Sequence, residues 1–275
     1  MIKFWSYKRE YEKYNFSLIS KINKTLKEGV IFFGNQLETF EKNFLKKNRA
    51  KYGIGVRSGT DALLISLKAI NIKSGDEVIT AANTAIPTIS AIINSGATPR
   101  LVDVDSNYLI DEKKIEKEIN SKTKAIIPVH LYGQSCNMNK ILRISKKYNL
   151  TIIEDCAQAQ GAKYKNKFVG TFGKFGCFSF YPTKILGAYG DGGFIITSNY
   201  NLYKKIKRIR FYGIETIDKK NQYKDKYYSN ENGLNSRLDE IQSCILNYKL
   251  KYIDKYINRR KVIANLYYKE LKTTS

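Results

Sequence analysis

The sequence is poor in the residues that build most metal and redox sites. It has one histidine and four cysteines in 275 residues, and the cysteines form no CxxC pair. Cys/His zinc sites and HExxH metalloprotease sites need more ligands than this. We therefore expect free thiols and no bound metal.

Long apolar runs are also absent. No apolar stretch approaches the roughly 20 residues needed to cross a bilayer. The N-terminal "MIKFWSYKREYEKYNF" lacks the apolar core of a signal peptide. With 43% apolar residues the chain can still bury a substantial core. We expect a globular, cytoplasmic protein that does not associate with membranes.

Acidic residues are few, and the formal net charge is +23. Only ten of the 48 basic residues are arginines, and the lysines are scattered in short pairs such as Lys146-Lys147 and Lys219-Lys220. Nucleic-acid recognition usually uses arginine forks and basic stripes that contain aromatic side chains. We therefore expect a lysine-rich surface and no nucleic-acid partner, and the charge is compatible with an anionic small substrate.

Short β-rich apolar runs alternate with helical patterns along the middle of the chain. This alternation predicts βαβ units, and therefore a largely parallel sheet flanked by helices, with ligands at the carboxyl ends of its strands. The predicted strands are 52–56, 77–81, 98–104, 125–131 and 150–156, and the predicted helices are at about 60–71, 86–95, 111–120 and 138–148. Residues 1–33 are predicted to form a helical arm, and residues 234–271 one or two long amphipathic helices.

Ser58, Gly59 and Thr60 follow the first predicted strand and open the next predicted helix. Free backbone N–H groups at a helix start, with two hydroxyls and a glycine, can bind a phosphate. An ordinary Ser/Thr N-cap gives the same pattern. The nearby "GIGVRS" lacks the third glycine of G-x-G-x-x-G, and the chain contains no G-x-x-x-x-G-K-[ST] motif. The pattern therefore does not indicate a standard dinucleotide or P-loop site.

Asp155 and Lys184 are the two ionisable residues with unusual surroundings. Asp155 ends a predicted central strand, where a carboxylate needs a cation or strong donors. Lys184 follows the aromatic run "CFSFYPT" and precedes a glycine cluster; an apolar setting favours its neutral, nucleophilic amine. Taken singly, Asp155 could be a cap or an ion-pair partner, and Lys184 an ordinary loop lysine.

One chemistry uses the turn at 58–60, Asp155 and Lys184 together in a single pocket. Pyridoxal phosphate needs a clamp for its phosphate, an acid facing its cationic ring nitrogen, and an amine that condenses with its aldehyde. The sequence therefore predicts that Lys184 holds this cofactor, that Asp155 faces the ring nitrogen, and that the turn at 58–60 binds the phosphate.

The motifs resemble those of the DegT/DnrJ/EryC1/StrS family of sugar aminotransferases. The resemblance runs from "FFGNQLETFEKNF" through "SGTDAL", "GATPRLVDVD", "VHLYGQ", "IIEDCAQAQGA", "FSFYPTKILGAYGDGG" and "RFYG" to "GLNSRLDEIQ". It implies an α/β fold: a type I aminotransferase-like large domain with a mostly parallel sheet flanked by helices. This domain would span 1–248, and 249–275 would begin a small C-terminal domain that is largely absent, so we interpret the chain as a fragment.

The resemblance also implies roles for residues that bind phosphate. Gly59 and Thr60 match residues that bind the cofactor phosphate through backbone and hydroxyl, and Ser179 matches a second phosphate-binding hydroxyl. Asn235 matches an asparagine that reaches the phosphate of the neighbouring subunit's cofactor. A homodimer with shared active sites is therefore implied.

The remaining matches concern the cofactor ring. Asp155 matches the partner of the pyridine nitrogen, and Gln158 matches the side chain beside the phenolic oxygen. Lys184 matches the Schiff-base lysine, which also shuttles the proton between cofactor and substrate carbons. Asp155 and Lys184 are thus the predicted catalytic residues.

Three positions need separate comment. Ala85 stands where the family often places an aromatic ring against the cofactor face, and Gln160 stands where a histidine is common. The first departure leaves the stacking partner open, and the second bears on substrate choice. For His130 we favour a structural hydrogen-bonding role over proton transfer.

The implied function is an aminotransferase that moves an amino group from glutamate, through pyridoxal phosphate, to a 3- or 4-keto group of a nucleotide-linked sugar. One alternative is a sugar dehydratase of the same family, in which histidine replaces the lysine; Lys184 argues against it. A catalytically inactive or regulatory member that binds cofactor or sugar is the other alternative.

Overall fold

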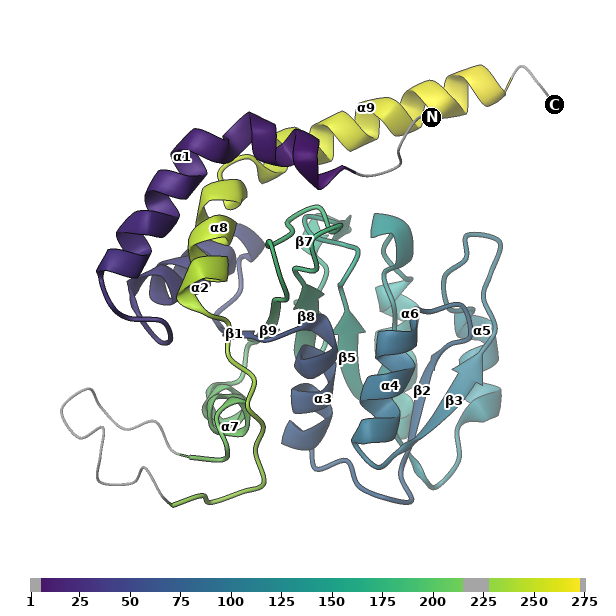
Figure 1. Cartoon of the computed structure of the whole chain (residues 1–275). Helices are drawn as coiled ribbons and strands as arrows, with labels where there is room; N and C mark the ends of the chain where they lie inside the picture. Colours follow the sequence, from purple (N-terminus) through teal and green to yellow (C-terminus); the bar gives the residue numbers. More distant parts are fainter. Residues whose placement is uncertain (1–5, 215–227, 273–275) are drawn as a thin grey trace.

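A seven-stranded sheet forms the centre of the computed structural model, which describes residues 6–214 and 228–272. Its strand order is β1-β9-β8-β5-β4-β2-β3 (Figure 1). β9 runs antiparallel to both of its neighbours, and the other adjacent strands are parallel. The sheet is mixed and mostly parallel, which confirms the predicted fold class. Its strands are β1 (Tyr52–Val56), β2 (Glu77–Ala81), β3 (Thr98–Val102), β4 (Thr123–Ile127), β5 (Thr151–Asp155), β8 (Phe175–Ser179) and β9 (Gly193–Thr197), and β6 (Lys163–Tyr164) pairs separately with β7 (Lys167–Phe168).

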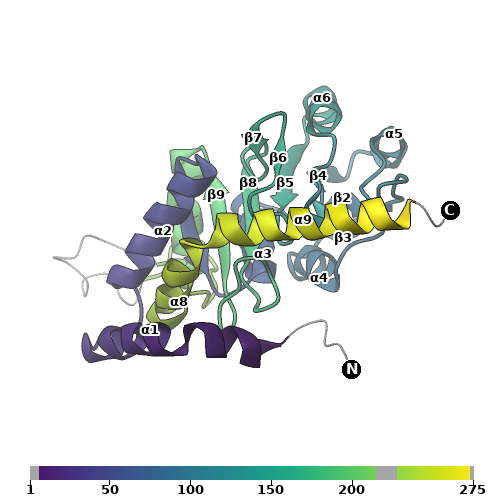
Figure 2. The same ribbon diagram turned by 90° about the horizontal axis from the view of Figure 1, so that it is seen from above.

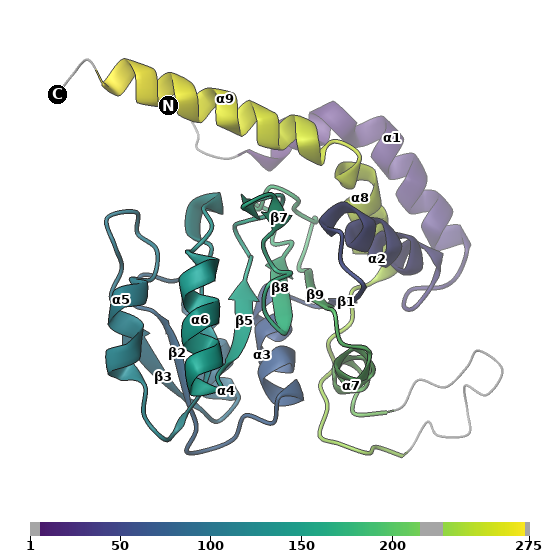
Figure 3. The same ribbon diagram turned by 180° about the vertical axis from the view of Figure 1, so that it is seen from behind.

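Helices cover both faces of the sheet. α3 and α4 lie on the face seen in Figure 1, and α5 and α6 lie on the opposite face, seen in Figure 3. The bounds of the helices are α1 (Tyr7–Lys27), α2 (Asn35–Asn48), α3 (Gly59–Ala69), α4 (Ile86–Asn94), α5 (Glu112–Ile115), α6 (Met138–Tyr148), α7 (Tyr200–Arg210), α8 (Glu240–Leu250) and α9 (Ile253–Leu271), with 3-10 turns at Glu116–Glu118 and Leu131–Gly133. Among the described residues no helix is both long and apolar enough to cross a membrane.

Buried aromatic side chains hold β8 and β9 against α2. All five residues of β8 are buried because helices cover both faces of the sheet at this strand. The rings of Phe44 and Phe194 lie 4.7 Å apart between centroids, and those of Phe44 and Phe178 lie 5.2 Å apart. This packing fixes the end of β8, from which the Lys184 loop begins.

The parallel strands end at one edge of the sheet, which we call the carboxyl edge. α9 passes over this edge, as the two views at right angles agree (Figures 1 and 2). Ile257 of α9 contacts Gly161, which follows β5 and has a left-handed φ of +84°. A side chain at Gly161 would collide with Ile257, so glycine lets α9 approach the edge closely.

Most of the predicted strands and helices are present in the structure, and β1 and β2 have the predicted bounds. The strand predicted at 125–131 is wrong in its second half. β4 ends at Ile127 because Pro128 has no N–H to donate to a neighbouring strand. The helix predicted at 111–120 is shorter, since α5 gives way to a 3-10 turn at Glu116.

The helix predicted from residue 234 begins late. The backbone N–H of Leu234 donates to the carbonyl of Ile209 at 2.7 Å, and Asn235 pairs with Phe211 in an isolated β-bridge. These bonds hold the segment extended. α8 starts only after Asp239, whose carboxylate accepts a hydrogen bond from the N–H of Gln242 at 2.7 Å. The predicted division of the chain at 248 stays a prediction.

Candidate active site

The carboxyl edge collects most of the residues expected to bind or act. Gly59 and Thr60 follow β1, Asp155 ends β5, and Ser179 ends β8, with Lys184 in the loop that follows. Because these strands run parallel, their ends meet at one edge whatever their separation in the sequence.

The turn between β1 and α3 combines a helix cap with two available amides. Ser58 is the N-cap, and its hydroxyl accepts a hydrogen bond from the N–H of Asp61 at 3.1 Å. The structure describes no partner for the N–H groups of Gly59 and Thr60, the first two residues of the helix. The cap interpretation therefore holds for Ser58, while Gly59 and Thr60 keep their capacity to bind an anion.

Gly59 lies directly against the end of β8. A Cβ atom on Gly59 would come within 2.7 Å of the Cβ of Ser179, which is too close for two such atoms. The hydroxyl of Ser179 accepts a hydrogen bond from the N–H of Tyr181 at 3.3 Å. The backbone of Gly59 and the hydroxyl of Ser179 thus form one small surface, built from residues that are far apart in the sequence.

Asp155 is a buried carboxyl group, only 4% exposed. Its oxygens accept hydrogen bonds from the hydroxyl of Thr88 at 2.8 Å and the N–H of Ala157 at 3.0 Å. Burial raises the pKa of Asp155, while these two hydrogen bonds and the charge of Lys184 act to lower it. A cation placed against this carboxylate would offset the cost of burying it.

Lys184 lies in a turn after β8, where its N–H donates to the carbonyl of Tyr181 at 2.8 Å. Its side chain is half-buried, and burial lowers the pKa of the amine, against the opposing effect of the Asp155 charge. Lys184 therefore reaches its neutral, nucleophilic form more readily than a surface lysine does.

Thr88 is a residue of this site that the sequence analysis missed. Its hydroxyl donates to Asp155 and lies 2.8 Å from the hydroxyl of Thr84, so that a chain of two hydroxyls leads to the acid. Thr88 is 1% exposed and sits in the first turns of α4, the helix after β2. Thr88 follows β2, which ends at the same edge as β5, and this position in the sequence could have indicated that Thr88 belongs to the site. Ala85, the N-cap of α4, starts this helix.

Two glutamines follow β5. The side-chain oxygen of Gln158 accepts a hydrogen bond from the N–H of Tyr132 at 2.9 Å. Gln160 is buried and donates through Nε2 to the carbonyl of Ser179 at 2.6 Å, and its own oxygen has no partner among the described residues. Gln160 thus ties the loop after β5 to the end of β8.

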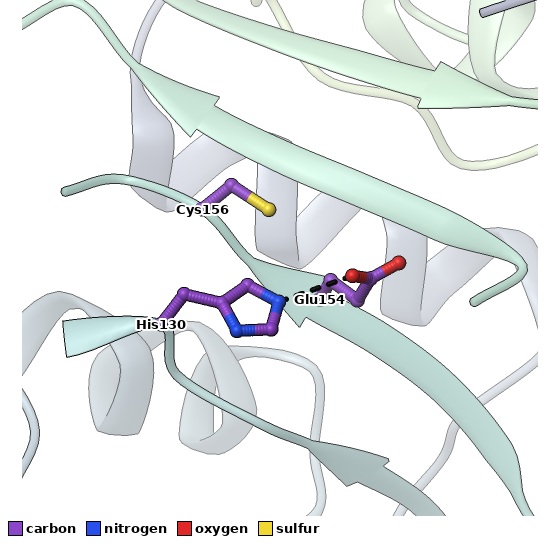
Figure 4. A group of neighbouring side chains, drawn as sticks. All are labelled: His130, Glu154 and Cys156. Carbon is purple, nitrogen blue, oxygen red and sulfur yellow. Dashed lines mark hydrogen bonds and ion pairs between the residues drawn. The ribbon is translucent and has the colours of Figure 1, made fainter. Parts of the chain in front are cut away.

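His130, Glu154 and Cys156 form a buried cluster whose polar atoms lie within 4.8 Å of one another (Figure 4). His130 Nδ1 accepts a hydrogen bond from the N–H of Cys136 at 3.1 Å, so Nε2 carries the proton and donates to Glu154 at 3.0 Å. Burial raises the pKa of Cys156 to about 12. Both ring nitrogens are committed to hydrogen bonds, in agreement with the structural role predicted for His130.

Asn235 lies outside the seven strands, in the extended segment before α8. Its backbone pairs with Phe211, and the hydroxyl of Ser236 accepts a hydrogen bond from the N–H of Arg57 at 3.1 Å. The Asn235 segment is thereby held beside the β1–α3 turn of its own chain.

Comparison with known proteins identifies relatives over nearly the whole chain. The model of the DegT/DnrJ/EryC1/StrS aminotransferase family matches residues 15–275. A dTDP-3-amino-3,6-dideoxy-alpha-D-galactopyranose transaminase from Aneurinibacillus thermoaerophilus is 46% identical, over 99% of this chain and 73% of the relative. A dTDP-3-amino-3,4,6-trideoxy-alpha-D-glucose transaminase from Micromonospora megalomicea subsp. nigra is 39% identical, over 96% of this chain and 68% of the relative.

A solved structure shares the fold. The crystal structure of NtdA from Bacillus subtilis, with bound cofactor PMP, superposes with a TM-score of 0.78 and 33% sequence identity. The match covers 91% of this chain and 59% of the solved one.

Proposed function

This chain belongs to the DegT/DnrJ/EryC1/StrS aminotransferase family, and we propose that it transfers an amino group from glutamate, by way of pyridoxal phosphate, to a keto group of a nucleotide-linked sugar. The observation that carries the proposal is the pairing of a buried acid, Asp155, with a half-buried lysine, Lys184, whose pKa is lowered. The substrate class is supported by the nucleotide-sugar names of the relatives.

The residues present fit the cofactor. Asp155 is a buried acid that needs a cation, and a protonated pyridine nitrogen supplies one. The unpartnered amides at the start of α3 and the hydroxyl of Ser179 suit a phosphate. When bound, pyridoxal phosphate supplies an electron sink for charge that develops on the substrate carbon.

In this proposal each residue has one task. Gly59, Thr60 and Ser179 bind the phosphate. Asp155 would stay ionised and accept a hydrogen bond from the ring nitrogen, while Thr88 and Ala157 hold its carboxylate in place. The side chain of Gln158 would hold the phenolic oxygen side of the ring. The amine of Lys184 would hold the cofactor through its aldehyde, and its free Nζ would accept the proton from the α-carbon of the amino donor.

Borohydride reduction followed by peptide mapping tests the role of Lys184. We expect a pyridoxyl group on Lys184, because burial lowers the pKa of its amine and so favours the neutral, nucleophilic form. Lys184→Arg keeps a positive charge but should carry no adduct, and it is the matched control. An adduct on another lysine, or none after reconstitution with cofactor, would contradict the proposal.

We also propose that the enzyme is a homodimer in which Asn235 serves the partner's cofactor. Within one chain the Asn235 segment already contacts the β1–α3 turn through Ser236 and Arg57, so action within the same subunit is the competing arrangement. Mixing Lys184→Ala with Asn235→Ala protein, under conditions that exchange subunits, separates the two. Action across the interface leaves one intact site in each mixed dimer and restores activity, whereas action within a subunit restores none.

A further inference from the structure

A pocket with a volume of about 360 Å³ adjoins Lys184 at the carboxyl edge. It lies between α1, α9 and the loop after β8, and Lys184 and Ile185 form part of its wall. The hydroxyls of Tyr14 and Tyr256, which contact each other, join α1 to α9 at this place. The pocket is therefore bounded by elements from both ends of the chain and by the lysine of the proposed active site.

The charged groups that line this pocket are nearly all cations. Lys249 is paired with Glu10, the one acid among the described residues that line the pocket, so these two charges offset each other. Four further cations line it in addition to Lys184: Arg9 and Lys13 from α1, and Arg259 and Arg260 from α9.

Within residues 6–214 and 228–272, Arg259 and Arg260 are exposed and form no ion pair. The ammonium of Lys13 lies 5.0 Å from the Tyr14 ring centre and 5.8 Å from that of Tyr256, which holds it at the pocket. Guanidinium groups bind carboxylates and phosphates through two parallel hydrogen bonds, and four neighbouring cations repel one another unless an anion enters.

We propose that Arg259 and Arg260, with Arg9 and Lys13, form an oxyanion-binding subsite for the substrates. The proposal rests on the proposed function, in which both substrates are anionic: the amino donor carries carboxylates, and the nucleotide-linked sugar carries a diphosphate. Either group would hold its substrate with the reacting carbon toward Lys184. The subsite is distinct from the proposed phosphate clamp, which uses Gly59 and Ser179.

Direct binding to the holoenzyme tests the subsite without any need for turnover. Calorimetry with inorganic pyrophosphate represents the diphosphate, and glutarate, which has no amino group to transfer, represents the donor. The variant is Arg259→Gln with Arg260→Gln. The control is Lys255→Gln with Lys261→Gln, which removes the same charge from exposed positions of α9 that do not line the pocket.

We expect the arginine variant to weaken binding of at least one probe about tenfold or more, because charge-assisted hydrogen bonds are lost. The control should change it less than about twofold because Lys255 and Lys261 do not line the pocket, and charges at a distance are screened by salt. A loss confined to pyrophosphate assigns the subsite to the diphosphate, a loss confined to glutarate assigns it to the donor, and a loss of both assigns it to both substrates.

Equal binding by wild type and arginine variant, equal losses in variant and control, or no binding to wild type would overturn the proposal. Mapping of the cofactor adduct to Lys184 reports separately on the proposed function, so the failure of one proposal can be told from the failure of the other. The arginines are exposed, and an unchanged melting temperature of the variant would show that the fold is intact.

Discussion

Glu154 and Asp155 are neighbours on β5, both are buried, and their side chains point to opposite faces of the sheet. Glu154 accepts hydrogen bonds from the N–H groups of Gly170, Phe172 and Gly173, each at 2.7 Å, and from His130 at 3.0 Å. These four donors fill the acceptor positions of the carboxylate. Glu154 therefore has no capacity left for a ligand.

From the described residues Asp155 accepts two hydrogen bonds, one on each oxygen. It ends its strand at the carboxyl edge, near Lys184, and burial raises its pKa. A carboxylate has about four acceptor positions, so half of its capacity is unused by the described residues. Of two adjacent buried acids, the incompletely bonded one is the candidate for function, and the fully bonded one holds the fold together.

The largest effect is expected at Glu154. In Glu154→Gln an amide NH2 would face N–H donors that now bond to a carboxylate, leaving buried groups unsatisfied. Removing one partner of such a buried charged network costs about 3–5 kcal/mol of the free energy of unfolding. Urea denaturation followed by circular dichroism measures the loss.

The control for this prediction is Glu12→Gln. Glu12 is an exposed acid of α1 whose carboxylate lies 3.9 Å from the ammonium of Lys8. It should change the free energy of unfolding by less than about 0.5 kcal/mol. If Glu154→Gln unfolded at the same urea concentration as wild type, the view of Glu154 as a structural carboxylate would be wrong.

Asp155→Asn should show the reverse pattern, with a large loss of activity and little loss of stability. The amide can keep both hydrogen bonds, because its oxygen accepts from Ala157 and its NH2 can donate to the hydroxyl of Thr88, which can turn toward Thr84. Losing the negative charge at the ring nitrogen should slow both half-reactions by about 10²–10³-fold, the usual effect of removing one electrostatic contact to developing charge. Stopped-flow absorbance of each half-reaction measures this.

The pH dependence of the same pair gives an independent check. The folded-state pKa of Asp155 is raised by burial, so the protonated acid favours folding. In cofactor-free protein, wild type should therefore lose stability relative to Asp155→Asn as the pH rises from about 4 through the raised pKa. Near-normal turnover of the variant would show that Asp155 is only a cap. A stability difference that does not change with pH would contradict the raised pKa of Asp155.

Local sequence patterns predicted the frame of this site well. The end of the strand at Asp155 and the turn between β1 and α3 were predicted from apolar runs bounded by polar residues. Such a run involves only a few neighbouring positions in the sequence. The start of α8 was wrong because bonds between residues 234–236 and the end of α7 hold that segment extended. Such bonds join residues more than twenty positions apart, and hydrophobic periodicity does not report them.

The role of Thr88 could not be predicted for a related reason. Thr88 belongs to the helix after β2, and β4 lies between β2 and β5 in the sheet. Contact between Thr88 and Asp155 therefore depends on the strand order and on how α4 packs. The separation of the two residues in the sequence predicts neither. The same holds for Glu240, which accepts hydrogen bonds from the first N–H groups of α2 across the sequence.

The smallest effect is expected at Thr88, which acts through Asp155 and touches no reacting atom in our proposal. Thr88→Val keeps the shape of the side chain but removes the hydrogen bond to the carboxylate. A hydrogen bond to a charged group is worth about 1.5 kcal/mol or more, so kcat should fall roughly tenfold. KM should change little because the carboxylate is held less firmly rather than lost. Thr88→Ser retains the hydroxyl and should restore most of the rate.

A merely structural role for Thr88 would give a different result. The hydrogen bond lowers the pKa of Asp155, so its loss should raise that pKa further and move the acid limb of the pH–rate profile to higher pH in Thr88→Val. The serine variant should keep the wild-type profile. If Thr88→Val lowered the melting temperature but left the pH–rate profile and kcat unchanged, Thr88 would have a structural role, as Glu154 has. The functional difference between Glu154 and Asp155 would then depend on Asp155 alone.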